Sequence, residues 1–180
     1  MTTGDFNTDD KLDLTVANVN DNTISVLLGN GDRTFQNQTT YSTGASPTFV
    51  IVDDFNSDDK LDLAVINSGI GTISVLFGNG NGTFLNYTSY SFRVEPLFIL
   101  AADINNDGNA DLIATNTLIS NTVNIVFGNG NGSFGDEIMY TTGISPMSVA
   151  VGAFRDKSKL DLVVANANDN DISLFFNSCP

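Results

Sequence analysis

The chain has 180 residues, of which 41% are hydrophobic, and its net charge is −14 because 21 acidic residues outnumber 7 basic ones. This composition is enough for a hydrophobic core in one or two domains, whereas the negative charge argues against nucleic acid and anionic membrane surfaces as partners. The sequence has no histidine and one cysteine, which excludes Ser-His catalytic triads, His/Cys zinc sites and a disulfide within the chain.

Four similar units follow one another along the chain. Aligning their acidic loops places Asp5, Asp54, Asp103 and Ala153 in register, at spacings of 49, 49 and 50 residues. Self-similarity at this period is typical of arrays of small β units such as propeller blades. We therefore expect a single array, with units at about residues 1–46, 47–95, 96–145 and 146–180.

Each unit contains four short segments with strand character. In the second unit they are residues 47–53, 61–67, 72–79 and 84–92, which are rich in β-branched or aromatic residues and bounded by Gly, Asn, Asp or Ser. No stretch shows sustained helical spacing, so the sequence predicts an all-β fold with blades of four antiparallel strands. The first segment is apolar on both faces and should be the innermost strand, and the polar fourth segment should be outermost.

A glycine-rich turn lies between the third and fourth segments of the first three units. The three turns span Gly29–Phe35, Gly78–Phe84 and Gly128–Phe134. Glycine at alternate positions supplies positive φ for a tight reversal, so we expect hairpin turns, each closed by a Phe that anchors in the core. A phosphate site is disfavoured, because no helix follows these turns and no lysine is nearby.

The two ends of the array are incomplete relative to the repeat. Only Met1 to Gly4 precede the first loop, where an inner strand belongs, and the fourth unit stops at residues 172–180 without an outer strand. The sequence thus predicts about four blades, the first lacking most of its inner strand and the last its outer strand. We expect the exposed edges to be covered by each other, by another chain or by further sequence.

The termini carry two further signals. Cys179 either pairs with another chain or is a partly buried thiol. No apolar run approaches the length of a membrane helix, and the first residues lack the features of a signal peptide. We therefore expect no membrane insertion and read no targeting signal.

The acidic loops carry oxygen-bearing side chains at alternate positions. Counted from the first Asp, positions 1, 3, 5 and 9 have side-chain oxygens, and position 7 offers a main-chain carbonyl, as in the first half of an EF-hand loop. The first loop has Asp5, Asn7, Asp9, Lys11 and Asp13, the second Asp54, Asn56, Asp58, Lys60 and Asp62, and the third Asp103, Asn105, Asp107, Asn109 and Asp111. These hard oxygens favour Ca²⁺ over Mg²⁺, since Ca²⁺ tolerates an irregular cage.

The alternative interpretation is that the loops are ordinary Asx turns, which are rich in Asp and Asn in any β protein. Three copies in identical register favour three Ca²⁺ sites. At position 6 the turn needs positive φ, for which Gly108 is ideal and which Asp10 and Asp59 can adopt at some cost.

The fourth loop differs from the other three. Its equivalent positions are Ala153, Arg155, Lys157 and Asp161, so two ligands have become cationic and one has been lost. We expect this loop, around Lys157, to bind no metal, with Lys157 or Arg155 partly replacing the charge of the ion near Asp161.

Taken together, these motifs resemble the FG-GAP/VCBS repeats of integrin α-subunit propellers and of many extracellular proteins. The resemblance covers essentially the whole chain. It rests on the Asp-x-Asn-x-Asp loop followed by Leu-Asp-Leu, on the turns after Leu28-Gly29, Phe77-Gly78 and Phe127-Gly128, and on the joints at residues 44–47, 143–146 and, in altered form, 94–96. It implies a propeller of four-stranded blades, Ca²⁺ between the first and second strands, and an extracellular or cell-surface role in adhesion or recognition.

Several Asn residues lie in N-glycosylation sequons. Their number is close to that expected by chance from the composition, so position is more informative. Two lie in glycine-rich turns and two in outer strands, where a glycan could be tolerated: Asn81, Asn131, Asn37 and Asn86.

Two non-catalytic functions remain open, because the acidic clusters are better explained by a repeated metal loop than by a glycosidase acid and base. In the first, the chain is a Ca²⁺-stabilised extracellular module that binds a protein or glycan. In the second, it is a structural subunit whose copies complete one another by strand complementation into a ring or filament.

Overall fold

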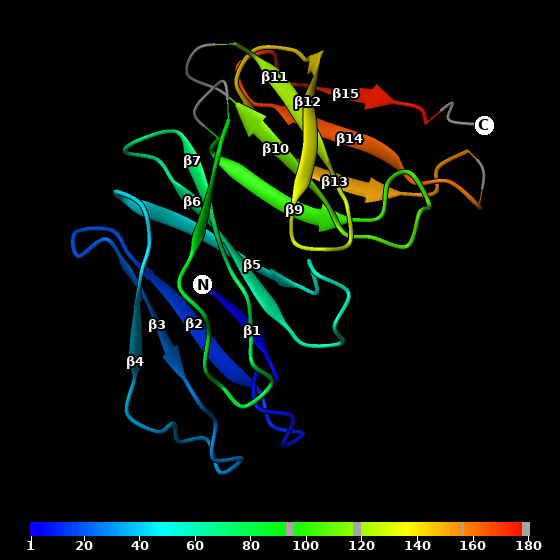
Figure 1. Ribbon diagram of the computed structural model, residues 1–180. Helices are drawn as coiled ribbons and strands as arrows, with labels where there is room; N and C mark the ends of the chain where they lie inside the picture. The colour runs from blue at the N-terminus through cyan, green and yellow to red at the C-terminus, as the bar shows by residue number, and fades with distance from the viewer. Residues whose placement is uncertain (93–95, 117–119, 156, 178–180) are drawn as a thin grey trace.

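The computed structural model of the protein describes residues 1–92, 96–116, 120–155 and 157–177. Its regular structure is all β, with fifteen strands in four antiparallel sheets that follow one another along the chain as blades (Figure 1). Within these residues, no helix has the length and apolar character needed to cross a bilayer. The expected fold class is confirmed.

Consecutive strands are neighbours in every sheet. Blade 1 contains β1 (Thr2–Gly4), β2 (Asp13–Asn18), β3 (Thr23–Leu27) and β4 (Thr39–Ser42). Blade 2 contains β5 (Pro47–Asp53), β6 (Asp62–Asn67), β7 (Thr72–Leu76) and β8 (Thr88–Ser91). Blade 3 contains β9 (Phe98–Ala102), β10 (Asp111–Asn116), β11 (Thr122–Gly128) and β12 (Phe134–Thr141), and blade 4 contains β13 (Pro146–Gly152), β14 (Asp161–Asn166) and β15 (Asp171–Phe175).

The order of the strands within a blade is as predicted, but their burial follows their polarity only in part. The polar fourth strand is outermost, as predicted, and most of β8 is exposed. The most buried strands are the second and third, since every residue of β6 and β7 is buried, whereas the apolar β5 is largely half-buried. The first strand is an edge of its sheet, so it lacks the neighbour on one side that covers β6 and β7.

One predicted strand is shorter than expected. Residues 84–92 were predicted to form the outer strand of blade 2, but β8 begins at Thr88. Phe84 forms only an isolated bridge with Gly78 and is 7% exposed, because its ring packs into the core between blades 1 and 2. The prediction that the Phe of the turn is an anchor is confirmed here, but it is wrong for the first turn, where Phe35 is 46% exposed.

Hydrophobic cores lie between successive blades rather than inside one of them. The first joins Ile24 and Val26 of blade 1 to Leu63 of blade 2. The second joins the opposite face of blade 2 to blade 3, and the third joins blade 3 to blade 4. Each inner blade is therefore buried on both faces, which explains why every residue of β6 and β10 is buried.

The ends of the array show the incompleteness that the sequence predicts. The strand β1 has three residues, and β15 is the last strand of a three-stranded sheet among the described residues. Ile172 and Leu174 of β15 are 59% and 48% exposed, although Ile73 and Val75 at the equivalent places in β7 are fully buried. Cys179 and residues 94–95 of the altered joint lie outside the described residues.

Candidate metal centre

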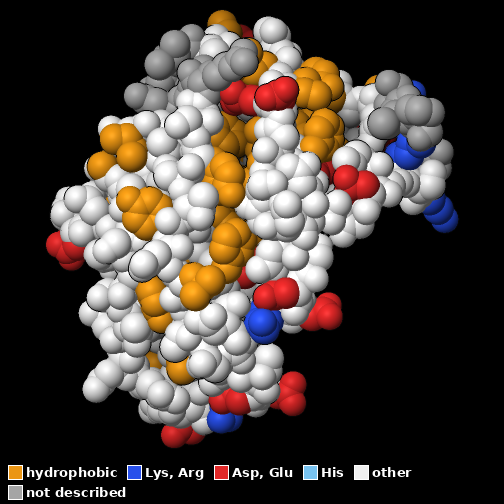
Figure 2. All heavy atoms as spheres, viewed as in Figure 1, with side chains coloured by type: hydrophobic (Ala, Val, Ile, Leu, Met, Phe, Trp, Pro, Cys, Tyr) orange, Lys and Arg blue, Asp and Glu red, His pale blue; other side chains and the backbone are white. Residues whose placement is uncertain are grey.

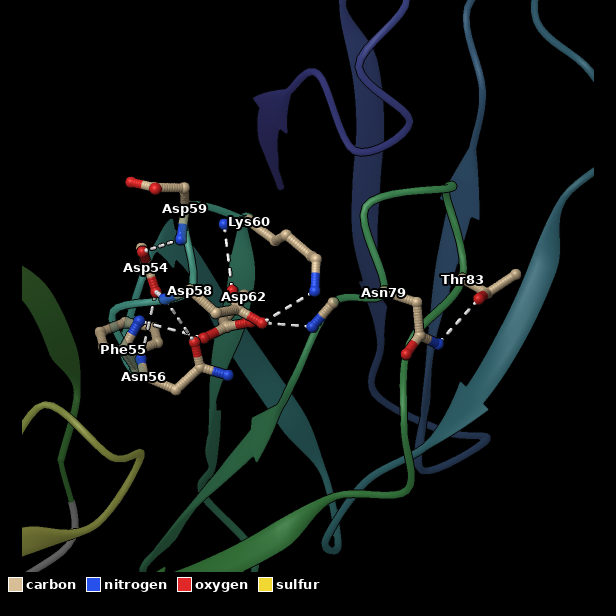
Figure 3. Close-up of polar contacts among 10 residues, drawn as sticks. Asp54, Phe55, Asn56, Asp58, Asp59, Lys60, Asp62, Asn79 and Thr83 are labelled. Atoms are coloured by element: carbon tan, nitrogen blue, oxygen red, sulfur yellow. Dashed lines mark hydrogen bonds and ion pairs between the residues drawn. The ribbon is translucent and has the colours of Figure 1, made fainter.

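The three acidic loops occupy the same place in their blades, between the first and second strands. Figure 3 shows the loop between β5 and β6, where the side chains of Asp54, Asn56 and Asp58 point back toward the main chain of the loop. In each of blades 1, 2 and 3, the predicted ligands at positions 1 to 7 thus lie on one short turn, and the ligand at position 9 is the first residue of the strand that follows.

The first carboxylate of each loop holds the turn closed. In the second loop, Oδ1 of Asp54 accepts a hydrogen bond from the N–H of Asp58 at 3.2 Å, and Oδ2 accepts one from the N–H of Asp59 at 2.7 Å. Asp5 does the same at 3.1 and 2.8 Å, and Asp103 at 3.0 and 2.8 Å. The loop geometry is therefore repeated three times, as its sequence is.

The carboxylate at position 5 has a different partner in the third loop. The Lys60 ammonium lies 3.1 Å from Oδ2 of Asp58, and Lys11 lies 3.0 Å from Asp9, where its hydrogen bond lowers the pKa of that carboxyl. In the third loop Asn105 donates to Asp107 at 2.9 Å and lowers its pKa. In the first two loops the carboxylate at position 5 is therefore paired with a lysine ammonium. In the third loop it accepts a hydrogen bond from an amide instead.

The carboxylate at position 9 is fully buried and ties the loop to the glycine-rich turn. Oδ2 of Asp62 accepts from the N–H of Phe55 at 3.0 Å, and Oδ1 accepts from the N–H of Gly78 at 2.8 Å. The equivalent bonds are made by Asp13, Asp111 and, in the fourth unit, Asp161. This structural role of position 9 was not predicted from the sequence. The sequence does carry a signal for it, since the fourth loop keeps the Asp at position 9 although it has lost the acidic residues at positions 1 and 5.

Burial and crowding make these carboxylates unfavourable as free anions. Burial is the main cause that raises the pKa of Asp62, to about 6; the charges of Asp58 and Asp54 add to the rise, and two backbone hydrogen bonds oppose it. Burial likewise raises the pKa of Asp111. A cation in the loop would relieve this repulsion.

The backbone of the loops has two left-handed positions. Position 6 has positive φ as predicted, at 61° for Asp10 and Asp59 and 86° for Gly108. Position 4 also has positive φ, close to 60° for Thr8, Ser57 and Asn106, and this was not predicted. With two left-handed residues in one short turn, the N–H groups of positions 5 and 6 both face the carboxylate of Asp54, or of its equivalent, which accepts their hydrogen bonds.

The donor set of the loops fits a hard cation. The predicted ligands are all carboxylate, amide or carbonyl oxygens, and the buried Oδ1 of Asn7, at position 3, makes no hydrogen bond within the described residues. In the part of the chain that the structure describes, no three carboxylates or thiolates converge closely enough to form a metal site by themselves. A cation would therefore draw on the amide and carbonyl oxygens as well as on the carboxylates.

The fourth loop keeps only the buried Asp. Arg155 does not turn its guanidinium toward Asp161: it donates to the carbonyl of Asn177 at 3.2 Å and lies over the ring of Phe176, with Cζ 4.7 Å from the ring centre. The absence of metal from this loop, and a role for Lys157 in its charge balance, stay predictions.

The predicted glycosylation sites are all exposed. In two turns the asparagine oxygen closes an Asx turn, since Asn81 accepts from the N–H of Thr83 at 3.1 Å and Asn131 from that of Ser133 at 3.0 Å. Asn37 and Asn86 were predicted to lie in outer strands, but they lie just before β4 and β8, because these strands begin later than expected. Glycan occupancy stays a prediction.

Comparison with family models gives two matches to the FG-GAP-like repeat, at residues 5–65 and 54–114. They are offset by 49 residues, which is the repeat period, and together they cover more than half of the chain. No curated protein sequence is significantly similar.

Solved structures resemble the whole described fold. A lectin of Agrocybe aegerita that recognises non-reducing terminal N-acetylglucosamine superposes with a TM-score of 0.65 at 14% identity, covering 98% of this chain and 48% of the lectin. BBS1N, solved in complex with ARL6DN, gives 0.65 at 12% identity, covering 98% and 56%. The Tc holotoxin pore of Photorhabdus luminescens gives 0.57 at 14% identity, covering 94% and 8%. The chain spans about half the length of the first two structures, and these likenesses concern the fold.

Proposed function

Because the chain belongs to the FG-GAP-like repeat family, we propose that it is a non-catalytic recognition module, stabilised by Ca²⁺ at three loops and working outside the cell or at its surface. The observation that carries the proposal is the threefold repetition of one oxygen-rich loop at one place in the fold. A catalytic centre is normally a unique constellation, whereas a structural ion recurs with the element that it stabilises.

Each ion would be held by the residues at positions 1, 3, 5, 7 and 9 of its loop. Bound Ca²⁺ would supply positive charge beside the buried carboxylate at position 9, whose pKa burial raises in the second and third loops. Since that carboxylate also holds the N–H of Gly78 or Gly128, the ion would stabilise the contact between the loop and the hairpin turn. Each loop is also closed by its own hydrogen bonds, in which the carboxylate at position 1 accepts from backbone N–H groups of the loop.

The proposed ligand is a protein or a glycan. The lectin with the same fold recognises a terminal sugar, and BBS1N was solved with a protein partner, so the fold is compatible with both classes. A nucleic acid or an anionic membrane would meet a chain with 21 acidic and 7 basic residues and be repelled. The same acidic excess suits a module that works where Ca²⁺ is abundant, because carboxylates are ligands for Ca²⁺.

Removing Ca²⁺ should lower the melting temperature. A ligand that binds only the folded state at tenfold its Kd adds about 1.4 kcal/mol per site, which for a chain of this size is roughly 3–6 °C of Tm per site. The measurement is a thermal melt followed by circular dichroism, in Ca²⁺, in Mg²⁺ and in chelator. Mg²⁺ should restore little of the shift, and a melt that is the same in all three buffers would contradict the proposal.

A further inference from the structure

Each glycine-rich turn contains the dipeptide Asn-Gly, and two of the three turns contain it twice. The first turn has Asn30-Gly31, the second has Asn79-Gly80 and Asn81-Gly82, and the third has Asn129-Gly130 and Asn131-Gly132. The Asn of every pair is exposed. In Asn-Gly, the main-chain nitrogen of the glycine can reach the side-chain amide carbon of the Asn with little obstruction, because glycine has no Cβ.

This approach leads to deamidation in two steps. The glycine nitrogen loses its proton and forms a bond to Cγ of the Asn, while the bond from Cγ to Nδ2 breaks and ammonia leaves with that proton. The product is a five-membered succinimide ring. Water then opens the ring at either of its carbonyls, which gives aspartate in a normal or a β-linked main chain. The first step requires a main-chain N–H that is free to lose its proton.

In the second pair of each turn, the glycine N–H is held by the blade before. The N–H of Gly82 donates to the carbonyl of Phe6 at 2.8 Å, and the N–H of Gly132 donates to that of Phe55 at 3.0 Å. Both glycines are buried. Such an N–H neither loses its proton nor approaches the neighbouring side chain until the contact between the blades opens locally.

In the first pair of each turn, the glycine N–H has no such bond. Within the described residues, no protein group accepts a hydrogen bond from the N–H of Gly31, Gly80 or Gly130. Nδ2 of Asn79 donates to the hydroxyl of Thr83 at 2.9 Å (Figure 3), and the first and third turns repeat this bond at 2.8 and 2.9 Å. The bond is made by the nitrogen that leaves, so the amide carbon stays open to attack.

The first turn shows that the fold accepts a normally linked aspartate product. Asp32 stands where the other turns have Asn81 and Asn131. Its Oδ1 accepts from the N–H of Thr34 at 3.0 Å and from the hydroxyl at 2.5 Å. Oδ1 of Asn81 accepts from the same two groups of Thr83 at 3.1 and 2.6 Å. Strain in the product therefore does not protect Asn81, whereas the bonded N–H of the next glycine does.

We propose that Asn30, Asn79 and Asn129 are sites of spontaneous deamidation, and that the hydrogen bond from the next glycine to the blade before keeps Asn81 and Asn131 unreacted. Water is the only reactant besides the chain itself. The inference goes beyond the proposed recognition role and requires neither a ligand nor metal in the loops.

The modification changes the end of the blades that carries the acidic loops. Figure 2 shows the charged side chains of blades 1 and 2 gathered mainly toward the bottom and lower right of the view, where these loops lie in Figure 1. Gly80 packs against Lys60 there, since a Cβ on it would lie 3.0 Å from Cδ of the lysine. Each conversion adds one negative charge. The β-linked product also adds one carbon atom to the main chain of a turn that the N–H of Asn79 closes by donating to the Thr83 carbonyl at 2.9 Å.

The test follows deamidation at each Asn by mass spectrometry. The full chain is made in bacteria that attach no N-glycans, because Asn81 and Asn131 lie in sequons, and it is kept in mildly alkaline buffer for days. Digestion and electron-transfer fragmentation then locate each aspartate and identify its linkage. We expect Asn30, Asn79 and Asn129 to convert about tenfold faster than the other two, since a buried hydrogen bond must open first at those. In urea all five should convert at similar rates.

A variant that loosens the second turn tests the cause. Phe84→Leu shortens the side chain that anchors this turn beside Phe6, so it should speed conversion of Asn81 several-fold and leave Asn131 unchanged. Leu85→Ala, at the exposed next residue, is the matched control. Circular dichroism checks that both variants fold.

Three results would overturn the inference. The first is that Asn79 and Asn81 convert at the same rate in the folded chain, and the second is that no Asn converts there while the chain in urea does. The third is that Asn81 stays as slow in a folded Phe84→Leu variant as in Leu85→Ala. The comparison of the folded chain with the chain in urea decides the matter even if Phe84→Leu does not fold.

Discussion

Asp62→Ala should lower the free energy of unfolding by about 4 kcal/mol, since each buried hydrogen-bond donor that loses its partner typically costs about 1–3 kcal/mol and two donors are affected. The carboxylate is fully buried and is the acceptor for both Phe55 N–H and Gly78 N–H. Alanine would leave these two donors without a partner in a place that water does not reach. Urea unfolding in chelator measures this structural effect separately from any loss of metal.

Asp62→Asn and Asp59→Asn are the matched controls for this prediction. Asn at position 62 keeps one acceptor and should cost less than alanine. Asp59 is exposed with φ of 61°, which Asn tolerates, so its replacement should change stability by no more than about 0.5 kcal/mol. If Asp62→Ala unfolds at the same urea concentration as Asp59→Asn in chelator, the carboxylate does not hold the blade together.

Gly132→Ala should cost about 3 kcal/mol, because a left-handed backbone costs an L-residue about 1–2 kcal/mol and overpacking costs about 1–3 kcal/mol. Gly132 has φ of 80°, and a Cβ there would lie 2.3 Å from Cζ of Phe77. The turn would have to move away from blade 2, which would stretch the 3.0 Å hydrogen bond to the Phe55 carbonyl. Urea unfolding again measures the loss.

Gly108→Ala separates the two causes. Gly108 has φ of 86°, but a Cβ there would meet no atom within 4 Å, so only the backbone cost of about 1–2 kcal/mol applies. Phe77→Ala removes the ring that a Cβ at position 132 would meet. Gly132→Ala should therefore cost less stability in a Phe77→Ala background than in the unmodified protein. Equal losses in Gly108→Ala and Gly132→Ala would show that the turn does not pack as described.

The blades could be predicted from the sequence because period and polarity act locally. A loop that recurs every 49 residues beside an apolar strand defines the unit, and the predicted strand at residues 47–53 coincides with β5. Positive φ at Asp10 and Asp59 was predictable because position 6 aligns with a glycine in the third loop. The same alignment gives no glycine at position 4, so the left-handed backbone of Ser57 had no signal.

Contacts between segments that are distant in the sequence could not be predicted from the repeat pattern. Asp62 reads as one more ligand in an acidic loop, and only the folded chain brings the N–H of Gly78 to it. Phe84 was expected in a core, but its socket comes from Phe6 and Tyr41, which belong to the blade before. The partial exposure of β5 has the same origin, since burial depends on which strands lie beside it.

The number of Ca²⁺ ions bound per chain tests the proposed calcium-stabilised blades most directly. The measurement is a calorimetric titration of chelator-treated, dialysed protein, with Asp107→Asn as a variant that removes one carboxylate from the third loop. We expect three ions per chain for the unmodified protein and two at the same affinity for the variant. Two results would contradict the proposal. One is binding of no Ca²⁺, and the other is binding of a fourth ion, since the cationic fourth loop is expected to bind none.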